Sequence, residues 1–214
     1  SGLGLPDRDY YLLDQPHYIK GRDKYPLHLK NLFNLAGIKD ADLKASNAFD
    51  VEKELAEIQI SRTERRDPEK TYNPMNTKEL SNLSDGKFSI WLESLEIQYF
   101  DRYIIESPKY MSALVKLIDE YPIDKWKDYL LARLVKSASG SLSDDFVEES
   151  YRFSSILTGR EEIPALWKRS VGLVNGLLGD ALGKIYVKKH FPPEYKQRMV
   201  KLIDNLLELS LIHI

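Results

Sequence analysis

Apolar residues along this chain recur three and four positions apart rather than two, from Tyr25 to near its carboxyl end. This spacing predicts amphipathic helices, because residues three and four apart share one face of an α-helix. A first apolar stretch covers residues 27–36 and stops at Gly37, and a second covers residues 48–62. The sequence therefore predicts an all-α fold of several helices, with at most one short β-like run.

Capping residues set the helix boundaries in the middle of the chain. Asn76 is followed three positions later by Glu79, the pattern of a capping box, and Ser107-Pro108 reads as an N-cap with proline at the first helical position. The predicted helices then cover residues 76 onward, 88–95, 108–121, 123–137 and 143–159. Residues 97–105 form the single β-like run.

Two more helices are predicted over residues 167–190 and 192–207. The first contains Gly172, Gly176, Gly179 and Gly183, and each glycine costs about 1 kcal/mol relative to alanine in a helix interior. Either these glycines allow a neighbouring helix to approach closely, or the helix breaks near Gly176. With no repeat or linker in the chain, residues 1–207 are predicted to be a single helical domain and residues 208–214 an atypical tail.

The composition limits the classes of protein to which the chain can belong. With 43% apolar and 30% charged residues, the chain resembles a soluble globular protein, and its net charge of -2 gives no overall field that favours nucleic acid. Cysteine is absent, which excludes disulfides, thiolate metal sites and cysteine nucleophiles. The sequence contains no run of about 18 apolar residues, so it predicts no membrane-spanning helix. The predicted compartment is the cytoplasm, with the bacterial cell envelope or secretion as the alternative.

Candidate catalytic residues are not found in the sequence. A zinc hydrolase of the H-E-x-x-H type needs two histidines four apart on one helix face, and none of His17, His28, His190 and His213 has that context. Each is interpreted as a surface or interhelical residue. Residues 137–141 (SASGS) lack the order of a catalytic serine elbow, and residues 2–4 (GLG) lack the third glycine of a phosphate loop. The sequence predicts no catalytic, cofactor-binding or metal-binding residue.

Four stretches, in order, resemble the neprilysin and endothelin-converting-enzyme family of zinc metallopeptidases. They are residues 2–11 (GLGLPDRDYY), residues 66–75 (RDPEKTYNPM), residues 167–169 (WKR) and residues 181–187 (ALGKIYV). The similarity reaches about Leu207 and covers the amino-terminal, non-zinc portion of that family. Ser170 stands where disulfide-bonded animal members have cysteine, so the chain is similar to a bacterial member. The family's motif residues here are Arg66, Asp67, Pro68, Tyr72, Asn73, Met75, Trp167, Arg169 and Gly183.

The resemblance implies a lid-type helical domain that covers the cleft of a zinc metalloendopeptidase. The family's zinc ligands lie beyond this chain, so proteolysis of oligopeptides would require Zn²⁺ and a carboxy-terminal catalytic domain, and this stretch alone is predicted to be inactive. Its exposed apolar face would also allow self-association. The alternative is a free-standing helical interaction module that keeps the lid fold.

The segment RRDPEKTYNPM, residues 65–75, carries two prolines that restrict the backbone. It is interpreted as an extended strap between two helices rather than as a direct substrate contact.

Overall fold

A computed structural model describes residues 2–160 and 162–212, so His213 and the end of the predicted tail lie outside the described residues. The chain divides into two compact units, Ser1–Glu161 and Glu162–Ile214, which are treated separately below. The structure is mainly helical, which confirms the predicted fold class.

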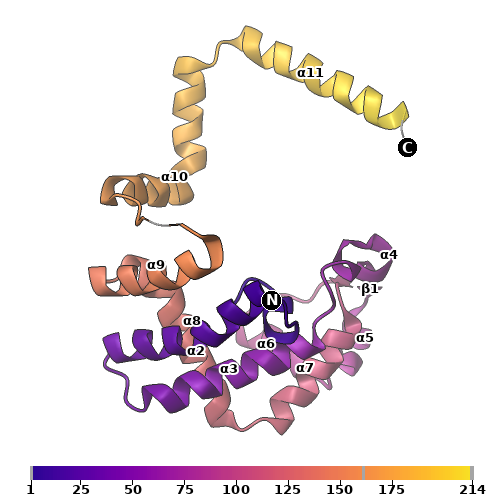
Figure 1. Ribbon diagram of the computed structural model, residues 1–214. Coiled ribbons are helices and arrows are strands. Elements are labelled where there is room, and N and C mark those ends of the chain that lie inside the picture. Colours follow the sequence, from indigo (N-terminus) through magenta and orange to yellow (C-terminus); the bar gives the residue numbers. More distant parts are fainter. Residues whose placement is uncertain (1, 161, 213–214) are drawn as a thin grey trace. The chain divides into compact units, whose positions relative to one another are not determined.

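The core of the first unit lies between four helices (Figure 1): α2 (Pro16–Leu35), α3 (Ala41–Ile58), α8 (Ile123–Ala138) and α9 (Asp144–Thr158). Helix α3 packs against both α2 and α8, and α9 packs against α2. Four alanines on the buried side of α3, namely Ala41, Ala45, Ala48 and Ala56, keep that face narrow. The larger core side chains come from the helices around it, including Tyr25, Leu29, Phe33, Tyr129 and Phe153.

The first two long helices start earlier than predicted. Helix α2 begins at Pro16 and continues through Pro26, although proline usually marks a helix boundary. Helix α3 begins at Ala41 and ends at Ile58 instead of covering residues 48–62. Its early turns bury alanines, which contribute little to an apolar pattern, so the periodicity became visible only from Ala48 onward.

A smaller set of elements follows α3 in the first unit: η1 (Glu64–Arg66), α4 (Pro68–Thr71), β1 (Asn73–Met75), α5 (Thr77–Leu83), α6 (Lys87–Ser94) and β2 (Tyr103–Ile105). Strands β1 and β2 pair antiparallel, with Pro74 opposite Ile104. The predicted β-like run is thus limited to β2, and a second short strand, β1, lies in the segment interpreted as a strap.

Local capping signals agree with the structure. The capping box at Asn76 and Glu79 is formed in both directions at the start of α5. Ser107 accepts a hydrogen bond from the Tyr110 amide at the start of α7 (Pro108–Glu120), and Gly159 ends α9 with a φ of 71°. The unit is completed by α1 (Asp9–Leu12) and η2 (Ser139–Ser141).

The second unit consists of α10 (Leu166–His190) and α11 (Pro193–Ile212). Helix α10 runs through Gly176 without a break, and α11 continues beyond Leu207. Apart from the adjacent residues and the helix's own backbone, no atom of the described residues lies within 4 Å of a Cβ placed at Gly172, Gly176, Gly179 or Gly183. The close helix approach considered for these glycines is therefore not made inside this unit.

Apolar side chains of the second unit are largely exposed. Helix α10 has no buried residue, and Leu177 and Leu206 are 75% and 57% exposed. In the part of the chain that the structure covers, no helix combines the length and apolarity needed to cross a membrane.

Candidate functional site

The motif residues within the strap, residues 65–75, are held in place by backbone and polar contacts. The Asp67 carboxylate accepts a hydrogen bond from the Glu69 amide and caps α4, whose first residue is Pro68. The side chain of Asn73 donates to the carbonyl oxygen of Ile105 at 3.0 Å, in addition to the backbone pairing of β1 with β2. Residues 65–75 are therefore a folded segment whose strand β1 pairs with β2, rather than a simply extended connection.

The remaining motif side chains lie nearer to solvent. Tyr72 is 52% exposed, and the guanidinium of Arg102 lies 5.5 Å from the centre of its ring. Arg66 is exposed at the end of η1, and Met75 pairs across the strands with Tyr103. The structure thus brings Arg66, Asp67, Pro68, Tyr72, Asn73 and Met75 together in one segment of the first unit.

Trp167, Arg169 and Gly183 all lie on α10 in the second unit. Trp167 is 64% exposed, and its ring contacts the ammonium group of Lys168 at 5.5 Å. The nine motif residues therefore form two groups, one in each unit.

The amino-terminal motif is held by a buried carboxylate that the sequence analysis missed. Glu52 of α3 is fully buried and accepts hydrogen bonds from the hydroxyls of Tyr11 at 2.5 Å and Tyr25 at 3.0 Å. Its oxygen Oε2 also accepts the Gly4 amide at 3.0 Å. The Tyr11 hydroxyl in turn accepts the amide of Leu5 at 2.9 Å. One carboxylate thus organises three donors from two other segments.

The carbonyl oxygens of the same stretch are bound by α8. Tyr129 donates to the carbonyl of Gly2 at 2.8 Å, Arg133 to that of Leu3 at 2.7 Å, and Lys136 to that of Gly4 at 2.7 Å. Residues 2–5 are therefore locked between α3 and α8. The backbone groups of the glycine motif are thus engaged in closing the core of the unit.

Burial controls the protonation of this cluster. It raises the pKa of Glu52, while hydrogen bonds from Tyr11, Gly4 and Tyr25 oppose that rise. Burial, together with the charge of Glu52, raises the pKa of Tyr11 and of Tyr25, so both phenols remain protonated donors. A signal for Glu52 was present in the sequence, because it lies among Ala45, Ala48, Leu55 and Ala56 on the apolar stripe of α3.

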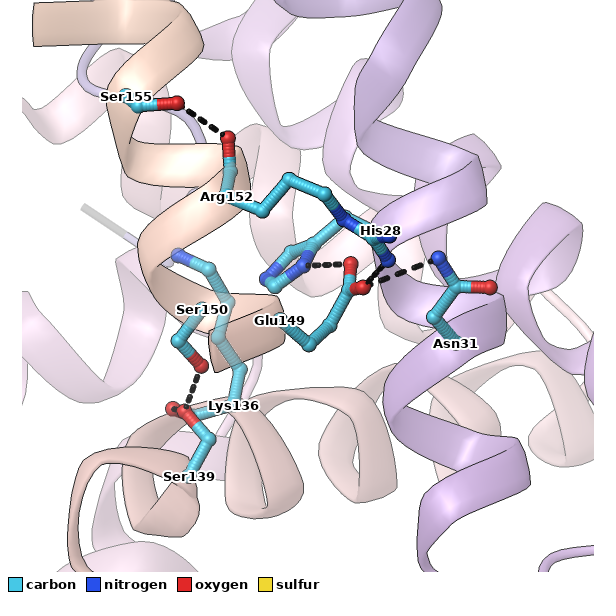
Figure 2. A network of polar contacts seen from close by, with 8 residues as sticks. All are labelled: His28, Asn31, Lys136, Ser139, Glu149, Ser150, Arg152 and Ser155. Atoms are coloured by element: carbon cyan, nitrogen blue, oxygen red, sulfur yellow. Dashed lines mark hydrogen bonds and ion pairs between the residues drawn. The ribbon is translucent and has the colours of Figure 1, made fainter. Parts of the chain in front are cut away.

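A second buried pair joins α2 to α9 (Figure 2). The carboxylate of Glu149 points from α9 toward α2, where it lies 2.9 Å from His28 Nδ1 and accepts the side-chain amide of Asn31 at 3.2 Å. Arg152, one turn further along α9, forms an ion pair with the same carboxylate. His28 is thus an interhelical residue, as interpreted from the sequence.

The imidazole of His28 is neutral near physiological pH. Burial, with smaller contributions from the cations Lys136 and Arg152, lowers the pKa of His28 to about 3. Since Arg152 already neutralises Glu149, the neutral ring donates its Nδ1 proton to the carboxylate. This arrangement links two helices and shows no feature of a general base near pH 7.

Acid is expected to destabilise the first unit through His28. The unfolded chain binds a proton at this histidine below a pKa of 6.5, whereas the folded chain does so only near 3. Stability should fall as pH drops through this window, by up to about 1.4 kcal/mol per pH unit. The raised pKa of Glu52 acts in the opposite direction and offsets part of this loss. Urea unfolding at several pH values measures the slope.

His28→Gln should flatten that slope, while His17→Gln, at an exposed histidine, should leave it unchanged. Equal slopes in the wild type and His28→Gln would contradict the assignment.

A pocket of about 540 Å³ lies where the amino-terminal motif meets η1. It is lined by Pro6, Asp7, Tyr10, His17, Tyr18, Arg62, Arg65 and Arg66. The Asp7 carboxylate accepts the Asp9 amide at 2.9 Å and pairs with Arg62 at 3.4 Å. Two motifs that are far apart in the sequence therefore border one basic depression.

Comparison with known proteins decides the family. The family model for the amino-terminal region of peptidase family M13 matches residues 1–209 of this chain. The chain belongs to peptidase family M13. The resemblance to neprilysin and the endothelin-converting enzymes, and to the amino-terminal region of a bacterial member, is confirmed.

Relatives of this M13 chain come from bacteria and mammals. It is 28% identical to the neutral endopeptidase of Lactobacillus helveticus over 208 residues, which cover 96% of this chain and 32% of that protein. It is 24% identical to human neprilysin over 236 residues, covering 97% of this chain and 30% of the relative.

A solved structure of the zinc metalloprotease Zmp1 of Mycobacterium tuberculosis, in complex with an inhibitor, matches with a TM-score of 0.86 and 29% identity. That match covers 97% of the M13 chain and 32% of Zmp1. The chain thus spans about a third of the length of its relatives.

The described side chains of this M13 chain do not form a zinc site. Within residues 2–160 and 162–212, no group of three or more His, Asp or Glu residues is placed to hold a metal ion. The pair of His28 and Glu149 offers two ligands, and both are already engaged with each other and with Arg152. A catalytic zinc site needs three protein ligands and an open position.

Proposed function

We propose that this chain is the amino-terminal helical segment of a zinc metalloendopeptidase that hydrolyses oligopeptides. In the complete protein it walls or caps the substrate chamber and contributes no catalytic residue. Zinc and its ligands would come from a carboxy-terminal catalytic domain, which would attack the peptide bond with a zinc-activated water. The observation that carries this proposal is the match over residues 1–209 to M13 together with coverage of only 32% of the length of a relative.

The exposed apolar side chains of the second unit support a missing partner surface. Apolar residues spread along both helices, among them Leu173, Leu177 and Leu178 on α10 and Leu202 and Leu206 on α11, are about half exposed or more. Extensive exposed apolar surface usually marks an interaction site. We assign it to contacts with the catalytic domain of the complete protein, since this chain covers only 32% of the length of its Lactobacillus helveticus relative.

Peptide hydrolysis tests the proposal directly. The 214-residue chain with added Zn²⁺ should leave an oligopeptide intact, whereas the longer polypeptide with its carboxy-terminal domain should cleave it and lose activity with a chelator. The longer form should also cleave short peptides in preference to folded proteins, because a walled chamber restricts entry. Hydrolysis by the 214-residue chain itself, abolished by a chelator, would refute the proposal.

The same exposed face supports the alternative of a free-standing interaction module. The downstream coding sequence separates the two: an H-E-x-x-H motif in the same reading frame supports the enzyme, and a stop codon supports the module.

Self-association of the isolated chain is expected in either case. Sedimentation velocity should show oligomers whose fraction rises with concentration, because the exposed leucines of α10 and α11 can bury each other. The double substitution Leu177→Gln with Leu206→Gln should reduce it. Leu43→Gln, at a residue that is 62% exposed on α3, is the matched control and should have little effect. A strictly monomeric profile at high concentration would contradict this expectation.

A further inference from the structure

The basic pocket beside η1 is lined by more arginines than carboxylates. Three arginines face one carboxylate, Asp7, which pairs with Arg62 at 3.4 Å and accepts the Asp9 amide. Arg65 pairs with Glu106 at 3.1 Å, but both groups are about half exposed, and such surface pairs exchange readily. Arg66 has no ion-pair partner in the part of the chain that the structure describes.

The walls of the pocket suit an organic anion rather than a bare inorganic one. Tyr10 and Tyr18 contribute aromatic surface beside the arginines, and their rings meet edge to face at 4.9 Å. A volume of about 540 Å³ lies within the range of small-molecule and peptide sites, which is about 300–1,000 Å³. Guanidinium groups bind carboxylates through two parallel hydrogen bonds, which gives both affinity and orientation.

We propose that this pocket binds a carboxylate of an oligopeptide, and that Arg66 holds this carboxylate together with Arg62, whose side chain is 60% exposed and keeps its pair with Asp7. The two tyrosines contact the adjoining residue. Arg65 exchanges Glu106 for the incoming carboxylate. The inference rests on the proposed function, since it names the class of peptide that the chamber wall favours. Arg66 of the strap and Tyr10 of the amino-terminal motif would then both contact the bound peptide in one site.

Binding to the full 214-residue chain tests this site without any hydrolysis. The probes are an N-acetylated pentapeptide of neutral residues with a free carboxyl terminus, its carboxy-terminal amide, and inorganic phosphate, each measured by isothermal titration calorimetry. The acid should bind at least about tenfold more tightly than the amide, as expected for loss of a charge-assisted hydrogen bond. Its affinity should fall as the salt concentration rises, because exposed charges are screened.

Variants locate the binding to the pocket. Arg66→Gln and Arg62→Gln should each weaken binding of the acid about tenfold with an unchanged circular dichroism spectrum, because a charge-assisted contact is lost at an exposed side chain. Arg160→Gln, at an exposed arginine outside the pocket, is the matched control and should bind like the wild type.

Equal binding of acid and amide, no binding of either, binding of phosphate alone, or wild-type affinity in both pocket variants would each overturn the inference. These results would leave the proposed function standing, because it is judged by hydrolysis in the longer polypeptide.

Discussion

Replacing Gly4 with alanine is expected to lower the free energy of unfolding of the first unit by about 3 kcal/mol or more, through steric overlap and lost hydrogen bonds in a buried site. A Cβ at this position would lie 1.7 Å from the hydroxyl oxygen of Tyr25 and 2.9 Å from a carboxylate oxygen of Glu52. Both side chains are fully buried and hydrogen-bonded to each other, so neither can move without breaking that contact. Urea unfolding followed by circular dichroism gives the change in midpoint.

Gly140→Ala is the matched control for this substitution. Gly140 lies in η2, and apart from its adjacent residues and the helix's own backbone no atom of the described residues lies within 4 Å of a Cβ placed there. Its effect should stay within about 0.5 kcal/mol, as is usual for surface positions. If the two alanine variants unfolded at the same urea concentration, residues 2–5 could not be packed as the structure has them.

Replacing Glu52 with alanine is expected to cost about 3–5 kcal/mol, because each of three buried donors left without an acceptor costs about 1–3 kcal/mol and some of them can find other partners. The hydroxyls of Tyr11 and Tyr25 and the amide of Gly4 would lose their shared acceptor inside the core. Lys136 would also lose a favourable electrostatic partner, since the charge of Glu52 opposes the lowering of its pKa by burial. The measurement is again the urea midpoint and the associated slope.

Two further variants serve as comparisons for Glu52→Ala. Glu57→Ala changes an exposed glutamate on the same helix and should shift stability by no more than about 0.5 kcal/mol. Glu52→Gln keeps the size and one acceptor oxygen but turns a second acceptor into a donor, so it should fall between the wild type and Glu52→Ala. A fully stable Glu52→Ala variant would show that the three donors find other partners at little cost.

Local signals predicted much of this fold. The capping box at Asn76, the N-cap at Ser107 and the stop at Gly159 depend on a few neighbouring residues, so sequence alone located them. Strand β1 could not be found in this way. It has three residues, one of them proline, and exists only because it pairs with Tyr103–Ile105 of β2.

Sequence reasoning on the candidate sites had a similar limit. The motifs identified the family, and Arg66 and Tyr10 were singled out in separate stretches, but nothing local indicated that they border one pocket. Glu52 and His28 each interrupt an apolar stripe, which is a readable sign of a buried polar contact. Their partners, Tyr11 and Glu149, lie 41 and 121 residues away and required the structure.

The anchoring of residues 2–5 by α8 has a consequence for synthesis on the ribosome. Gly4 is made before the residue that binds its carbonyl, Lys136, which follows 132 residues later. At about 5–20 residues per second, the opening segment waits several seconds or more before its site exists. Until then the binding site for Leu3 and Leu5 is incomplete, so this core closes by the docking of residues 2–5 only after α8 has been made.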